Sequence, residues 1–212
     1  GFETITIVNK GFCDHSDSLG AAGRFGEGDV QWMTAGRGVQ HSEMFPLLKT
    51  EEENPLELFQ IWLNLPQKDK FVDPHFAMLW HEDIPVVQEE NASVKVIAGK
   101  YKEAIAPDPA PNSWAAVQEN EVAVWNIHID ANSTYTLPKA NNAVNRILYF
   151  YEGSEIEIEG QTIQPNFGIA LNSSTAVKIK VGTTTAHFLM LQGNPINEPV
   201  VQHGPFVMNS QE

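Results

Sequence analysis

"GEGDVQWMTAGRGVQHSEM", residues 26–44, is the stretch that decides the fold. Closely spaced glycines suit sharp turns around a short alternating segment, and the last turn feeds a His-x-Glu pair, His41 and Glu43. Residues two apart in a strand project from the same face, so this imidazole and carboxylate would lie side by side. The pair could hold one metal ion or place a base beside a ligand, although the polar face of a surface strand explains an isolated pair more simply.

The remainder of the chain has the same extended character. Segment 57–66, ELFQIWLNLP, alternates, so that Phe59 and Ile61 would face one side and Gln60 and Trp62 the other. Short runs broken by Gly, Asn and Pro, with little long helical periodicity, are typical of β-sandwiches and barrels, and we predict an all-β fold. Further strands are predicted at 122–130, 145–153, 154–160, 176–182 and 186–195, with tight turns at Gly153 and Gly160.

A proline-rich segment, EAIAPDPAPNSW at residues 103–114, interrupts the strands. Prolines at alternate positions favour an extended connector over a strand or a helix. We therefore predict two similar β-barrels in one chain, an N-terminal barrel over residues 1–105 and a C-terminal barrel over residues 106–212.

Composition argues against several classes of function. Lys and Arg total 13 against 27 Asp and Glu, and the net charge of −14 would repel phosphate backbones, so direct nucleic-acid binding is not expected. The sequence has no apolar run of the roughly 18 residues that a membrane helix needs. Cys13 is the only cysteine, which rules out an internal disulfide and a thiolate metal cluster. We expect a cytoplasmic protein without a membrane partner.

Several separated blocks of the sequence resemble one family. They are GFET at 1–4, H-x-DSLG at 15–20, GDVQWMTAG followed by HSEM within 28–44, ELFQIWLNLP at 57–66 and GNPINEPVVQHGPFVMN at 193–209. Together these blocks closely resemble the pirin family of the cupin superfamily. The resemblance implies a bicupin, in which two jelly-roll cupin barrels share one chain. It also implies one mononuclear metal site in the N-terminal barrel and a C-terminal barrel without a metal set.

The resemblance also implies the metal ligands. The family's site uses three His and one Glu, and its HSE motif falls here on His41 and Glu43. The other two His form an H-x-H pair ahead of GFET, so they are expected upstream of Gly1. The chain begins in what reads as mid-strand and ends where the family usually continues, so both ends look trimmed. The implied metal is iron, as Fe(II), and nitrogen and oxygen donors also suit Mn, Ni, Cu or Zn.

Three functional hypotheses follow. The first is a metal-dependent dioxygenase of the quercetinase type, which takes a flavonol-like aromatic substrate and dioxygen and uses Glu43 as the base for the flavonol 3-hydroxyl. The second is a redox-responsive iron protein that regulates a transcription factor or an enzyme complex through protein–protein binding. The third is a structural bicupin without chemistry, which applies if the upstream His pair is lost and the chain holds no metal.

Other polar residues have simpler interpretations. His15 lies among turn-forming Asp and Ser residues, which predicts a histidine in a turn. The alternatives are a spare metal ligand or a residue that hydrogen-bonds to the ligands. Glu3 lies at a position where many cupins have a ligand Glu. The resemblance to pirins instead implies that Glu3 is structural or hydrogen-bonds to the ligands. Cys13 is expected to be a buried filler rather than a nucleophile. Gln31 and its neighbours alternate, so some of them would shape the barrel interior. The histidines expected outside the metal site are His75, His81, His128, His187 and His203.

Overall fold

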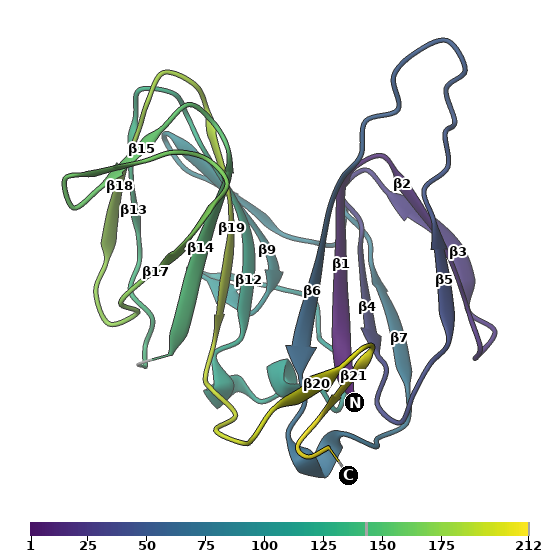
Figure 1. Ribbon diagram of the computed structural model, residues 1–212. Helices are drawn as coiled ribbons and strands as arrows, with labels where there is room; N and C mark the ends of the chain where they lie inside the picture. Colours follow the sequence, from purple (N-terminus) through teal and green to yellow (C-terminus); the bar gives the residue numbers. More distant parts are fainter. Residues whose placement is uncertain (143, 212) are drawn as a thin grey trace. The chain divides into compact units, whose positions relative to one another are not determined.

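The computed structural model describes residues 1–142 and 144–211 (Figure 1). Within these ranges the regular structure is almost entirely β-strand, and the helices are short 3-10 turns: η1 (Gln67–Asp69), η2 (Trp114–Ala116) and η3 (Gln118–Asn120). The predicted all-β class is therefore confirmed. None of these described helices has the length and apolar character needed to cross a membrane.

The chain divides into two compact units. The first is built from Gly1–Asp83, Asp108–Ala116 and the segment from Ile196 onward. The second is built from Ile84–Pro107 and Val117–Pro195. The two units therefore take alternating segments of the chain, whereas the boundary expected between residues 105 and 106 would divide it once.

Two sheets make up most of the first unit. One has the strand order β6-β1-β4-β7 and the other the order β3-β2-β5, with antiparallel pairing throughout. Figure 1 shows these two sheets facing each other, and we call the region between them, where the side chains of their facing sides lie, the lumen of the first unit. A hairpin of β20 (Val201–His203) and β21 (Phe206–Met208) completes the unit. The sheet strands are β1 (Phe2–Lys10), β2 (Phe12–Asp17), β3 (Ala22–Gly26), β4 (Val30–Thr34), β5 (His41–Met44), β6 (Glu57–Asn64) and β7 (His75–Leu79).

The second unit is also built from two main sheets. Their strand orders are β17-β14-β19-β12-β9-β8 and β13-β18-β15-β16, and β10 and β11 form a small hairpin. Fully buried apolar side chains, such as Val94, Ile127, Leu148 and Phe188, make one core. The strands are β8 (Val86–Gln88), β9 (Ala92–Ala98), β10 (Lys100–Tyr101), β11 (Ala104–Ile105), β12 (Ala123–Ile129), β13 (Thr134–Leu137), β14 (Asn145–Glu152), β15 (Ile156–Ile158), β16 (Gln161–Ile163), β17 (Phe167–Ala170), β18 (Val177–Val181) and β19 (Ala186–Gly193).

Alternation along β1 sorts its side chains between two environments. On one face the carboxylate of Glu3 accepts a hydrogen bond from the indole of Trp32 on β4. On the other face Thr6 contacts Gln60 of β6, whose amide also donates to Glu43 on β5. Because neighbouring residues of a strand point to opposite faces, the face that carries Thr6 is the one directed into the lumen.

A glycine turn delivers the chain to β5. Gly36 has a φ of +48°, and a Cβ atom at this position would lie 2.2 Å from the carbonyl oxygen of Val72. Only glycine fits such a close approach of two backbones. The prediction that glycines form the turn before the His-x-Glu strand is therefore confirmed.

The predicted strands and turns of the second unit are mostly found. β12, β14, β18 and β19 lie within the ranges expected for them. The tight turn at Gly160 is confirmed, because Ile158 pairs with Gln161 and the two residues between them, Glu159 and Gly160, have φ values of +51° and +76°. The turn expected at Gly153 does not join two paired strands. β14 and β15 belong to different sheets, so the chain bends at Gly153 from one sheet to the other.

Candidate metal centre

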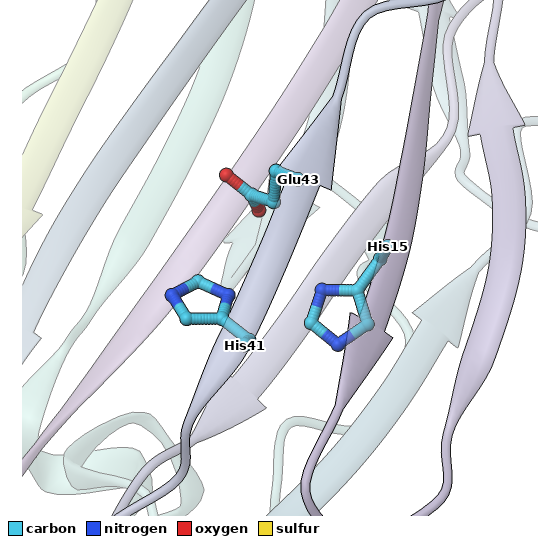
Figure 2. A group of neighbouring side chains, drawn as sticks. All are labelled: His15, His41 and Glu43. Carbon is cyan, nitrogen blue, oxygen red and sulfur yellow. The ribbon is translucent and has the colours of Figure 1, made fainter.

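Three potential metal ligands lie together on two paired strands of the first unit: His15 is buried, Glu43 is half-buried and His41 is exposed. β5 places His41 and Glu43 two residues apart, and the antiparallel register places His15 of β2 opposite Glu43. One ligand atom can be chosen from each side chain so that all three lie within 4.8 Å of one another. Figure 2 shows the three side chains lying close together. His15 thus joins the pair that the sequence singled out.

Asp17 holds the ring of His15 in one orientation. Nε2 of His15 lies 3.0 Å from Oδ2 of Asp17, and both side chains are buried. Oδ1 of Asp17 accepts hydrogen bonds from the backbone amides of Leu19 at 2.9 Å and Ala21 at 3.1 Å. Burial raises the pKa of Asp17, but the hydrogen bonds from His15 and these amides outweigh burial and lower it overall. The ionised carboxylate can only accept, so Nε2 of His15 carries the hydrogen of this bond, and in a neutral ring Nδ1 keeps the lone pair.

The lone pair of His15 Nδ1 faces the other two residues of the group. Figure 2 shows one ring nitrogen directed toward His41 and Glu43 and the other directed away. The ring centroid of His15 lies 5.5 Å from that of His41 and 5.4 Å from that of Phe76. His15 is 3% exposed, and within the described part of the chain its Nδ1 has no hydrogen-bond partner. An unpaired buried acceptor costs about 1–3 kcal/mol, so this atom is suited to a bound group.

Glu43 presents a second unpaired acceptor. Its Oε2 accepts a hydrogen bond from Nε2 of Gln60 at 3.3 Å, whereas its buried Oε1 has no partner among residues 1–142 and 144–211. Two acceptors that face one space cannot satisfy each other, but a cation can satisfy both. Imidazole nitrogen and carboxylate oxygen suit Fe(II) and the other divalent ions of the first transition series. The residues present therefore fit a metal ion.

The lumen wall combines polar and apolar rows. Thr6 of β1 lies between Gln60 of β6 and Gln31 of β4 in the sheet register, which makes a polar row. Gln31 is fully buried, and neither its amide nitrogen nor its oxygen has a hydrogen-bond partner in the two described ranges. The adjacent row contains Trp62, Thr4, Met33 and Phe76. An apolar wall with a few convergent polar groups is typical of small-molecule sites.

Glu3 lies on the other face of β1, away from this group. Its Oε1 accepts hydrogen bonds from Trp32 at 3.1 Å and Thr34 at 2.8 Å, and its Oε2 accepts one from Ser113 at 2.6 Å. Burial raises the pKa of Glu3, and these hydrogen bonds offset the rise only in part. These partners tie β1, β4 and the 108–116 segment together, which agrees with a structural role.

Cys13 is buried beside the group, on the same strand as His15. It packs with Val8 and Phe25 in a small apolar cluster. Burial, with a smaller contribution from the nearby carboxylates of Glu43 and Asp14, raises the pKa of the Cys13 thiol to about 12. The thiol is protonated at neutral pH, as expected for a buried filler.

A second group, Asp29, His81 and Glu82, also brings potential ligand atoms within 4.8 Å of one another. The two oxygens of Asp29 accept hydrogen bonds from the backbone amides of His81 at 2.9 Å and Gly26 at 3.0 Å. This carboxylate is therefore already used to hold two loops. His81 and Glu82 are exposed, which suits a surface ion pair rather than a ligand set.

Strand pairing joins two other histidines that sequence spacing could not connect. His128 of β12 lies opposite His187 of β19, and their ring centroids are 4.3 Å apart. The sequence likewise could not show the contacts of Asp17 with His15 or of Gln60 with Glu43, because both depend on side-chain placement within the fold.

Comparison with known proteins places the chain in a family. The model of the family Pirin matches residues 1–63, and that of the Pirin C-terminal cupin domain matches residues 124–212. Pirin-like protein 2 of Arabidopsis thaliana is 34% identical over 216 residues, which cover 100% of this chain and 64% of that protein. Pirin of Homo sapiens is 31% identical over 218 residues, covering 100% of this chain and 70% of that protein.

A solved structure gives the same relationship. Quercetin 2,3-dioxygenase from Acinetobacter baumannii superposes with a TM-score of 0.84 at 30% sequence identity, covering 100% of this chain and 71% of that one. The resemblance noted in the sequence and the predicted two-domain cupin fold are thereby confirmed. By its sequence and its structure, this chain belongs to the pirin family.

Proposed function

We propose that this protein is a metal-binding pirin that opens a flavonol ring with dioxygen, as a quercetin 2,3-dioxygenase does. His41 and Glu43 would ligate the metal, which we expect to be Fe(II), in a cytoplasmic protein. The observation that carries the proposal is the convergence of His15, His41 and Glu43 in the lumen, where two buried acceptor atoms lack partners in the described chain. The likeness to a quercetin 2,3-dioxygenase at 30% identity supports the substrate class.

The two oxygens of Glu43 suit different tasks. Gln60 holds Oε2, whereas Oε1 has no donor within the described ranges. When bound, the metal would polarise the oxygen donor of the substrate and hold dioxygen close to it. Glu43 would act as the base that takes the proton of the flavonol 3-hydroxyl. The row that includes Trp62, Met33 and Phe76 would flank the aromatic rings and exclude water.

The test begins with metal content after anaerobic iron loading of the protein. We expect about one iron per chain, measured by elemental analysis, and consumption of quercetin with dioxygen. The variant His41→Ala should lose iron, and Glu43→Gln should lose turnover. His203→Ala, which changes an exposed histidine on β20, is the matched control. Iron-loaded protein that leaves quercetin unchanged would refute the dioxygenase proposal, and full turnover by Glu43→Gln would refute the role of Glu43 as the base.

One observation favours the regulatory alternative, a redox-responsive iron protein that binds a protein partner. The chain that directly follows Glu43 exposes several large apolar side chains to solvent: Met44, Phe45, Leu47 and Leu48. Exposed apolar side chains in a group mark interaction sites. In this alternative, oxidation of the iron changes hydrogen exchange in residues 44–56. Equal exchange in the ferrous and ferric forms would exclude it.

A further inference from the structure

His128 and His187 form a pair of imidazoles that lies wholly within the second unit. The register of β12 with β19 places the two residues directly opposite each other, on strands that lie side by side in Figure 1. Their chain neighbours Ile127 and Phe188 are fully buried in the core of this unit. Because successive residues of a strand point to opposite faces, both histidines project from the face of the sheet that turns away from the core.

The separation of the two rings matches that of two ligands on one ion. Their centroids are 4.3 Å apart and their planes are inclined by 50°, so the rings are not stacked in parallel. A metal ion about 2.0–2.1 Å from a ring nitrogen lies about 3.2 Å from the centroid of that ring. Two rings that meet one ion at an angle of about 90° therefore have centroids about 4.5 Å apart. A right angle between ligands belongs to the tetragonal geometry that Cu(II) and Ni(II) prefer.

The other residues in this row across the sheet suit a cation. Ser93 of β9 lies opposite His128, and the irregularity in β14 places Glu152 opposite His187. The row of these four residues thus contains a carboxylate and neither Lys nor Arg. The ring of Tyr151 lies 6.0 Å from that of His187 and flanks it on the β14 side. His128 is exposed and His187 is half-buried, so an ion can approach the pair from solvent.

We propose that His128 and His187 together bind one divalent late transition-metal ion, Cu(II) in preference to the others, as an accessory site on the second unit. The site uses none of the residues of the candidate metal centre in the first unit. Imidazole suits these ions, and Cu(II) binds a given site most tightly among the divalent metals of the first transition series. The two paired strands hold the rings together before the ion arrives, so the second ring binds at a high effective concentration. The unfolded chain loses this advantage, because the two histidines are far apart in the sequence.

The probe is Cu(II), titrated into the protein against glycine as a competing chelator. Electron paramagnetic resonance follows the bound ion, since its hyperfine structure reports coordinated imidazole nitrogen. The variants are His128→Phe, His187→Phe and the double variant, each of which keeps an aromatic ring in the strand. We expect each single variant to bind this copper about 100-fold more weakly, because the chelate is lost. The double variant should lose little more, since one ring alone cannot chelate.

The control is His203→Phe, which changes an exposed histidine on β20 and should leave the copper affinity unchanged. Substitution of His128 and His187 by Gln, which keeps both positions polar, repeats the test if the Phe variants do not fold. An unchanged copper affinity in both single variants would refute the site. Losses that add in the double variant would also refute it, because they would show two independent imidazoles. If His41→Ala alone abolishes copper binding, the ion belongs to the first unit and the accessory site is refuted as well.

Discussion

Ser113 donates a hydrogen bond of 2.6 Å to Oε2 of Glu3, a residue 110 positions earlier in the chain. Both groups are buried, and the other carboxylate oxygen of Glu3 is held by Trp32 and Thr34 of β4. This one carboxylate therefore fixes the segment 108–116 to the strands of the first unit. The segment reads as a connector in the sequence, but Ser113 makes it part of the packing of β1.

The first prediction concerns that bond. Ser113→Ala leaves one oxygen of a buried carboxylate without its side-chain donor, so we expect the free energy of unfolding to fall by about 1–3 kcal/mol. Urea unfolding followed by tryptophan fluorescence measures the change. Ser174→Ala, which alters an exposed serine, should change the free energy by less than about 0.5 kcal/mol. Equal effects of the two substitutions would mean that the Glu3–Ser113 bond contributes nothing to stability.

The second prediction is a pH dependence. Burial raises the pKa of Glu3 above the value of 4.5 that a free side chain has. The native state therefore binds this proton more tightly than the unfolded chain. The stabilising contribution of protonated Glu3 is complete below pH 4.5 and is lost as the pH rises through the higher pKa of the folded protein. Relative to Glu3→Gln, the unmodified protein should lose stability over this window.

Unfolding by urea at steps between about pH 4 and pH 8 tests the sign, since each unit of pKa difference corresponds to about 1.4 kcal/mol. The matched control is Glu51→Gln, which changes an exposed loop glutamate. We subtract the free energy of unfolding of the unmodified protein from that of each variant. For Glu3→Gln this difference should shrink toward low pH, and for Glu51→Gln it should stay near zero at every pH. If the free energy of unfolding of Glu3→Gln minus that of the unmodified protein instead grows toward low pH, the fold lowers the pKa of Glu3.

The fold class could be predicted from the sequence because its signals are local. Alternation in 57–66 and the glycine turn before His41 are properties of a few adjacent residues, and both have the expected structural counterparts. Which sheet a strand joins depends on residues that are far away in the sequence. Nothing adjacent to Gly153 shows that β14 and β15 belong to different sheets, so the sequence predicts a tight turn between neighbouring strands where the chain bends from one sheet to the other.

The candidate site divides in the same way. His41 and Glu43 are recognisable because strand geometry alone places residues two apart on one face. His15 lies opposite Glu43 only because β2 pairs with β5 in one register. Its orientation then depends on Asp17, whose importance comes from a side-chain contact. The H-x-D spacing of His15 and Asp17 was the available signal, but it also reads as an ordinary turn.

The third prediction concerns Cys13. Because burial raises its pKa to about 12, only about one thiol in ten thousand is ionised at pH 8. We expect no reaction with 5,5′-dithiobis(2-nitrobenzoic acid) in the native protein over minutes, and one equivalent per chain in denaturing urea. Reaction of the native protein at the rate of a free thiol would contradict the buried position.

The fourth prediction concerns the contact behind Glu43. Gln60→Leu removes the donor to Oε2 of Glu43 and frees that carboxylate to turn. Loss of a group that orients a metal ligand costs about 10–100-fold in metal affinity, and we expect a loss in this range for Fe(II) or for Co(II) as a spectroscopic substitute. Competition with a chelator measures the affinity. Gln161→Leu, on exposed β16, is the control, and equal affinities of both variants would exclude an orienting role for Gln60.

The fifth prediction separates stability from function in the lumen. The buried amide of Gln31 has no hydrogen-bond partner in the described chain, so its burial opposes folding unless a bound molecule satisfies it. Gln31→Leu has nearly the same volume and no polar group. We therefore expect the free energy of unfolding of the metal-free variant to equal that of the unmodified protein or to exceed it by about 1–2 kcal/mol.

The same substitution should weaken anaerobic binding of quercetin to the iron-loaded protein by about tenfold. Thr6→Val, a neighbouring polar-to-apolar change whose side chain contacts Gln60, serves as the comparison. If Gln31→Leu destabilises the metal-free protein by more than about 1 kcal/mol, the amide is satisfied by an internal partner such as an ordered water, and its role is structural.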